Sequence, residues 1–318
     1  MAEERVYDKL PEIKPGERPK VLLVGNGLNR SFENKVIIED VIKKEWNSNY
    51  GYDITDSDAD DPSPVWNLPF PMQIAAATKG HVQSCLTDLA ETFKGYSVEP
   101  KQDALIKEML DAEFDTVLST NYSLEIEKST IADYTDRKVL RRYKQTDKST
   151  TTQTNLGIFQ CLEVPYANKP SLWHIHGIAL RKASMVMGHF GYGKLIAEVT
   201  EQAMKVNQQY HAATAKGNIF NPTSWVDYFL IGDIYIIGFK LDLSESDIWW
   251  LLSLKKSAFE DSKVYFYDKT IEEDKKILLD CYGVEIPSIP FIDSEEDAFI
   301  NYYKRVCRFI KAGNPMGI

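Results

Sequence analysis

The chain has 318 residues, and its hydrophobic fraction of 43% is enough to form a buried core. The formal net charge of −10 disfavours direct nucleic-acid binding, because contact with a phosphate backbone needs clustered cations. The first twenty residues are polar and no run is apolar for long enough to span a bilayer, so we expect a cytoplasmic protein with no membrane partner.

Short apolar runs alternate with helical stretches along most of the chain. The runs that we predict as strands are residues 21–25, 115–120, 171–177, 183–188, 233–239 and 263–268. Helical patterns include residues 102–112 and 246–258. This alternation predicts an α/β protein with a Rossmann-like, doubly wound parallel sheet.

Two segments interrupt the alternation. Residues 44–68 are rich in Asn, Asp, Ser and Pro, which predicts a loop, and residues 72–93 and 195–210 have helical patterns. We therefore predict a single domain over residues 1–318, in which a Rossmann core carries a smaller, mainly helical module. The predicted core covers about 18–40, 101–190 and 226–318, and the module about 41–100 and 191–225.

The cysteines give no sign of a metal site. Cys85, Cys161, Cys281 and Cys307 lie far apart and form no CxxC pair. This spacing favours buried free thiols over a zinc ribbon or a disulfide framework. We expect no zinc and no other metal.

A glycine-containing turn follows the first predicted strand. Gly25 and Gly27 permit a tight turn and a close approach of the backbone to a diphosphate, at the positive end of the helix that Asn29 opens. The third glycine of the usual GxGxxG is absent, so a simple turn is the alternative interpretation. Asn26 lies between the two glycines.

Polar residues follow the next two strands of the predicted core. Thr120 and Asn121 come after the strand at 115–120, where Asn can hold a ribose hydroxyl or an attacking water, although a polar turn or helix cap is an alternative. His174, His176 and Gly177 close the strand at 171–177.

Both histidines lie on one face if that strand is regular up to His176. An H-x-H pair could bind a metal, but no third and fourth ligands show a recognisable spacing. His176 beside Gly177 suits acid–base work, whereas two packed histidines are the alternative, for His174 in particular.

The strand predicted at 233–239 ends at Gly238 and Phe239. Glycine at this position lets the adenosine half of a ligand pass close to the backbone. The acidic turn that follows contains Asp242, Glu245 and Asp247, which we interpret as solvated residues or helix caps.

Residues 188–193 combine three glycines with two aromatic residues. They predict either a mobile flap that carries His189 over the site or an ordinary glycine-rich connection.

The order of these segments resembles the sirtuin superfamily, and more closely the zinc-less sirtuin-like NAD-hydrolase domains of bacterial anti-phage defence proteins. The similarity spans roughly residues 20–270. It implies that Asn121 and His176 are the catalytic pair. It further implies that NAD⁺ is bound by Gly25, Asn26, Gly27, Asn29, Thr120, Gly177, Gly238 and Phe239.

Two positions depart from the family pattern. Ser123 stands where an Asn-x-Asp motif has its acid, and Lys240 stands where Ser is usual. The identity of an auxiliary acid is therefore open. Only Cys161 lies between Asn121 and His176, in place of a four-cysteine zinc module, which argues against a histone-type deacylase.

The activity that the resemblance implies is hydrolysis of NAD⁺ to nicotinamide and ADP-ribose, which would deplete the cofactor in an infected cell and abort the infection. The alternatives are an NAD-dependent deacylase or ADP-ribosyltransferase, and a non-catalytic module that senses adenine nucleotides. An unrestrained NAD⁺ hydrolase would harm its host, so we expect a homo-oligomeric switch or a separately encoded regulatory partner.

Overall fold

A seven-stranded sheet forms the centre of the computed structural model, which describes residues 9–32, 38–50, 68–147 and 157–317. The strands follow the order β3-β4-β5-β2-β1-β6-β7. Their bounds are β1 Lys20–Val24, β2 Thr116–Ser119, β3 Lys144–Gln145, β4 Gln160–Glu163, β5 Ser171–His174, β6 Asp233–Ile237 and β7 Val264–Tyr267.

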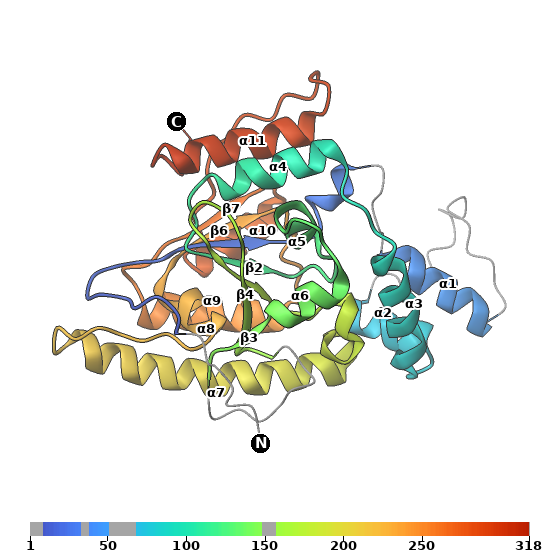
Figure 1. Ribbon diagram of the computed structural model, residues 1–318, viewed down its shortest axis with the longest axis horizontal. Coiled ribbons are helices and arrows are strands. Elements are labelled where there is room, and N and C mark those ends of the chain that lie inside the picture. Colours follow the sequence, from blue (N-terminus) through green and yellow to red (C-terminus); the bar gives the residue numbers. More distant parts are fainter. Residues whose placement is uncertain (1–8, 33–37, 51–67, 148–156, 318) are drawn as a thin grey trace.

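Helices cover both faces of this sheet (Figure 1), which confirms the predicted Rossmann-like α/β fold. The main helices are α1 Ile38–Tyr50, α2 Phe70–Ala77, α3 Val82–Lys94, α4 Pro100–Leu110, α5 Glu125–Thr130, α6 Asp136–Arg142, α7 Gly188–Thr214, α8 Trp225–Ile231, α9 Ser246–Ala258, α10 Glu273–Cys281 and α11 Ala298–Lys311. Among the described residues, none of the helices combines the length and the apolar composition that a membrane crossing needs.

Most of the sheet is parallel, and one edge is not. Strands β5, β2, β1, β6 and β7 pair in parallel, whereas β4 runs antiparallel to β5 and β3 antiparallel to β4. The two antiparallel strands are too short to give a clear apolar pattern, so the sequence predicted neither of them.

The strand predicted at residues 183–188 is absent. The chain forms the 3₁₀ helix η3 (Ala179–Ser184) there and then passes directly into α7. A sharp turn at Gly177, with φ at +89°, brings the following backbone back so that the N–H of Val186 donates to the carbonyl of His176 at 2.8 Å.

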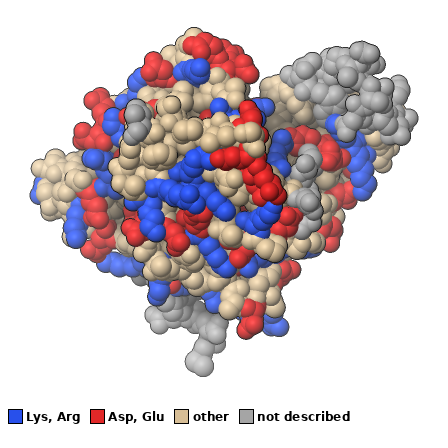
Figure 2. Space-filling model, turned by 90° about the horizontal axis from the view of Figure 1, so that it is seen from above, with Lys and Arg blue, Asp and Glu red and all other residues tan. Residues whose placement is uncertain are grey.

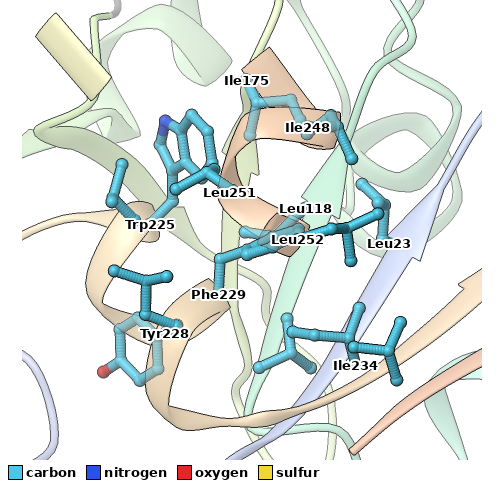
Figure 3. Packing of buried hydrophobic residues seen from close by; sticks show 14 of the residues in the cluster. Leu23, Leu118, Ile175, Trp225, Tyr228, Phe229, Ile234, Ile248, Leu251 and Leu252 are labelled. Atoms are coloured by element: carbon cyan, nitrogen blue, oxygen red, sulfur yellow. The ribbon is translucent and has the colours of Figure 1, made fainter. Parts of the chain in front are cut away.

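The side chains of β1 point alternately into two separate hydrophobic cores. Val21 and Leu23 face α7, α8 and α9, whereas Leu22 and Val24 face α4, α5 and α11. Figure 3 shows Leu23 of β1 in the first core together with Phe229 of α8 and Leu252 of α9. Burial on both faces explains why β1 is a continuous apolar run.

The layer of α4 and α11 presents a surface of mixed charge. Arg308 of α11 pairs with Glu108 of α4 at 2.9 Å, and Lys107 pairs with Asp103 at 2.7 Å. On the face seen in Figure 2, basic side chains gather near the centre and acidic side chains lie around them.

Helices α1, α2 and α3 enclose a third, smaller core that extends to Tyr122 and Met185. The helix predicted at 72–93 is two helices, because Lys79 and Gly80 both have positive φ. Of the loop predicted at 44–68, residues 44–50 belong to α1, and residues 51–67 lie outside the described part of the chain.

Helix α7 contains the predicted helical stretch 195–210 and joins the two parts of the molecule. It contacts α2 of the small core as well as α8 and α9 of the large core. Both interpretations of residues 188–193, a mobile flap and a glycine-rich connection, are wrong, since these residues form the first turns of α7.

The four cysteines are free thiols, as expected. Cys85, Cys161 and Cys307 are buried, but Cys281 is exposed, because it ends α10 at the surface. Burial raises the pKa of Cys85 and of Cys307 to about 12, so neither thiol is a reactive thiolate at neutral pH.

Candidate functional site

The loops that follow β1 and β6 meet at the carboxyl edge of the sheet. Strand β1 is the point where the strand order reverses, with β2 on one side and β6 on the other, and open α/β sheets bind ligands at such a point. The N–H of Gly27 donates to the carbonyl of Gly238 at 2.6 Å. A Cβ atom on Gly27 would lie 2.6 Å from that same oxygen, so the contact requires glycine.

A cavity of about 550 Å³ opens at this edge, which is the size of an ordinary small-molecule site. It is lined by the predicted site residues Asn26, Gly27, Thr120, Asn121, His176, Gly238 and Phe239. The other predicted site residues, Gly25, Asn29 and Gly177, are not among its lining residues. A Cβ atom on Gly25 would clash with Phe239, and Gly177 faces a second cavity of about 510 Å³.

Asn121 lines one side of the cavity, and Ser123 and Glu125 lie behind it; we call these three residues the Asn121 wall. Asn121 is 4% exposed, and its amide nitrogen donates to Oε1 of Glu125 at 2.6 Å. Among the described residues, the Asn121 amide oxygen has no hydrogen-bond partner. A buried acceptor without a donor is costly, so Asn121 can offer this oxygen to a ligand or a water.

A buried chain of hydrogen bonds continues from Glu125 to the loop after β1. The hydroxyl of Ser123 donates to Oε2 of Glu125 at 2.6 Å, and the amide of Asn29 donates to the Ser123 oxygen at 3.3 Å. Asn29 also donates to Asn26 at 3.2 Å and accepts from Gln102 at 2.8 Å. Asn29 therefore connects the two loops from behind the cavity.

His176, Tyr192 and Glu245 line a second polar side of the cavity, and the buried Asp247 lies behind His176; we call these four residues the His176 wall. Nε2 of His176 is 3.1 Å from Oδ2 of Asp247 and 3.8 Å from Oε2 of Glu245. Tyr192 donates to the same oxygen of Glu245 at 3.2 Å, and its ring meets that of His176 edge-on at 5.6 Å between centroids. Because Nε2 is engaged, Nδ1 is the ring nitrogen left for a ligand.

The charges of the His176 wall favour a positive group. Burial lowers the pKa of His176, but Asp247 and then Glu245 raise it, so that the net pKa lies above its ordinary value. Burial also raises the pKa of Glu245. Since two carboxylates face one imidazole, a proton or a cationic ligand is stabilised there.

The condition for His174 and His176 to share a face, a strand that is regular up to His176, is not met. Strand β5 ends at His174, and the chain turns before His176. The His174 ring lies 3.0 Å from Glu127 and 2.8 Å from the carbonyl oxygen of Asn121. It is a buried, satisfied histidine that supports the backbone of Asn121.

The structure also places residues that the sequence analysis did not assign to the site. We interpreted Glu245 and Asp247 as solvated or capping, but Asp247 is fully buried and the Glu245 side chain is only 16% exposed. A signal for Asp247 was present, because it lies four residues before Leu251 on the buried face of α9. His189 is exposed and lines the second cavity instead.

One group of side chains in the described part of the chain has the composition of a metal site. The donor atoms of His176, Glu245 and Asp247 all lie within 4.8 Å of one another. Nε2 of His176 and Oδ2 of Asp247 contact each other directly, whereas Oδ1 of Asp247 has no hydrogen-bond partner among the described residues.

Comparison with known proteins adds no relationship. No model of a protein family matches the sequence, and no curated protein matches it. The sirtuin resemblance therefore stays a prediction, and the argument for function rests on the geometry of the cavity.

Proposed function

We propose that this chain binds NAD⁺ in the cavity and hydrolyses the bond between nicotinamide and ribose. One observation carries the proposal. At the carboxyl ends of the adjacent strands β2 and β5, Asn121 supplies a buried amide oxygen without a donor and His176 supplies a ring nitrogen left for a ligand. Both groups line the same cavity.

The loops around the cavity suit the other half of a dinucleotide. Gly27 and Gly238 bring two backbone segments into contact with no intervening side chain, which allows close approach of a diphosphate. Arg30, Lys43 and Lys240 also line the cavity, and cations attract phosphate.

The His176 wall suits the reacting half. The pyridinium ring of NAD⁺ is positively charged, and positive charge moves to the ribose as the bond between C1′ and the ring nitrogen breaks. Glu245 and Asp247 stabilise that charge. The bonding electron pair goes to the nitrogen and neutralises nicotinamide, while water attacks C1′ and gives a proton to Nδ1 of His176. The Asn121 oxygen orients the water or a ribose hydroxyl by accepting its hydrogen.

The test is to incubate the purified protein with NAD⁺ and to separate the products by chromatography. We expect equal amounts of nicotinamide and ADP-ribose from the wild type. Turnover should fall at least about 100-fold in His176→Ala and in Asn121→Ala, because each group acts on the reacting atoms. The matched control is His189→Ala, an exposed histidine outside this cavity, which should keep full turnover and the same thermal unfolding midpoint.

Other products would point to the alternatives. Nicotinamide release that requires an added acyl-lysine peptide or a protein acceptor would indicate a transferase. Binding of NAD⁺ without any nicotinamide release would indicate a sensing module or the lack of a regulatory partner. Near-normal turnover in Asn121→Ala would contradict the proposed mechanism directly.

A further inference from the structure

We infer that Glu125 is a positioning residue that sets the direction in which the Asn121 amide points, and that Ser123 links this setting to the loop after β1. The kinetic consequence rests on the proposed function, whereas the hydrogen-bond arrangement can be tested without it. Glu125 has no access to the ligand of its own, since it is 3% exposed and is not among the cavity-lining residues.

The direction follows from the chemistry of the carboxylate. An ionised carboxylate has only acceptors, and Glu125 receives one donor on each oxygen, from Asn121 at 2.6 Å and from Ser123 at 2.6 Å. The atom of Asn121 that faces Glu125 must therefore be its nitrogen. The amide oxygen is then the atom that remains for the ligand.

The reversed amide is strongly disfavoured. It would bring the Asn121 oxygen against a carboxylate oxygen, so that two buried acceptors would meet without a hydrogen between them. It would also present an N–H donor to the ligand, and this group cannot accept a hydrogen bond from water or from a ribose hydroxyl. Glu125 therefore determines the polarity of the Asn121 wall.

Burial makes this arrangement rigid. A carboxylate removed from water is stable only when hydrogen bonds satisfy it, and both bonds to Glu125 are short. Ser123 cannot turn away without losing its acceptor, and it also holds Asn29 at 3.3 Å. Asn29 in turn contacts Asn26, which lines the cavity, so one chain of bonds joins the loop after β1 to Asn121.

The first variant is Glu125→Gln, which has nearly the same shape. Glutamine offers one acceptor and one donor in place of two acceptors, so the Asn121 amide can point in either direction. We expect kcat to fall by about tenfold or more with KM changed by less than about threefold, because the defect lies in orientation and not in binding. A kcat within twofold of wild type would overturn the inference.

Two further variants separate positioning from a general effect on the fold. In Asn121→Asp/Glu125→Gln the donor and acceptor are exchanged, so the aspartate again presents an oxygen to the ligand, and we expect kcat to recover at least about threefold over Glu125→Gln. In the Asn121→Ala background, Glu125→Gln should have no additional effect, because Glu125 acts only through Asn121. Additive losses would contradict the inference.

A spectroscopic measurement keeps this test independent of the proposed activity. With selective ¹⁵N-asparagine labelling, Asn121→Ala identifies the side-chain NH₂ signals of Asn121. These signals should show the downfield shift of a donor to a carboxylate in the wild type and lose it in Glu125→Gln. A wild type that releases no nicotinamide but shows the shift would reject the NAD⁺ hydrolase and retain the positioning role. A wild type without the shift would reject the positioning role.

Discussion

The two polar walls of the cavity hold their key side chains by different means. On the Asn121 wall, a chain of hydrogen bonds from Asn29 ends on Glu125, and every bond has one possible direction. On the His176 wall, two carboxylates surround a group that gains and loses a proton. The Asn121 wall determines the direction of the Asn121 amide, whereas the His176 wall determines the protonation state of His176.

This difference predicts different responses to pH. Glu125 acts by orienting the Asn121 amide. Substitutions in the Asn121 wall should therefore lower turnover by the same factor at every pH, without shifting the pH at which turnover rises. The state of His176 depends on Asp247 and Glu245, so changes there should move the pH dependence as well. Each substitution below tests this division between the walls.

The largest effect is expected for Asp247→Asn. Asparagine can donate to Nε2 of His176, which would leave the hydrogen on Nδ1 and remove the base from the cavity. We expect turnover to fall by about 100-fold or more. Steady-state kinetics across pH would measure the fall, with the exposed Asp261→Asn as a control for loss of one negative charge. A turnover unchanged by Asp247→Asn would remove His176 as the base.

A second, smaller effect is the pH dependence of the wild type. The pKa of His176 is raised, and the base is its neutral form, so turnover should increase about tenfold per pH unit up to that raised pKa and then level off. The contribution of this histidine to the stability of the fold changes with pH in the opposite direction to turnover. The pairing with Asp247 stabilises the fold fully below the pKa of an unfolded histidine, and this contribution is lost as pH rises through the folded pKa.

Kinetic and unfolding measurements across pH would check both trends, with Glu125→Gln as the reference. In that variant the rise in turnover should occur at the same pH as in the wild type, because His176 keeps its partners. If turnover of Glu125→Gln rose at a different pH from the wild type, the two walls would not act independently.

Much of the fold could be predicted, because short-range patterns of apolar residues and turn residues determine most of its strands and helices. Continuous apolar runs at β1, β2 and β6 indicated a parallel sheet, and the turn at Gly25 and Gly27 indicated the carboxyl edge. Local patterns misled where tertiary contacts decide the structure. Residues 183–188 are apolar enough for a strand, but the turn at Gly177 directs them toward α7.

The candidate site was predictable only in part. Polar residues that directly follow strands, such as Asn121 and His176, stand out in a sequence. Tyr192 reaches the site through the first turns of α7, and no spacing in the sequence links it to Glu245. Glu125 lies only four residues after Asn121, but Asn121 precedes helix α5, so the helical rule for residues four apart does not predict their contact. Partners joined by tertiary contacts appear only when the elements that carry them are placed.

The smallest effect is expected for Tyr192→Phe, which removes one hydrogen bond to Glu245 and keeps the ring contact with His176. That hydrogen bond lowers the pKa of Glu245, so its loss should raise this pKa further and weaken the negative field at His176. A single hydrogen bond contributes about 1 kcal/mol, which corresponds to about a fivefold loss of kcat/KM. Kinetics near neutral pH would measure it. A loss as large as that of Asp247→Asn would mean that Glu245, and not Asp247, governs the charge of His176.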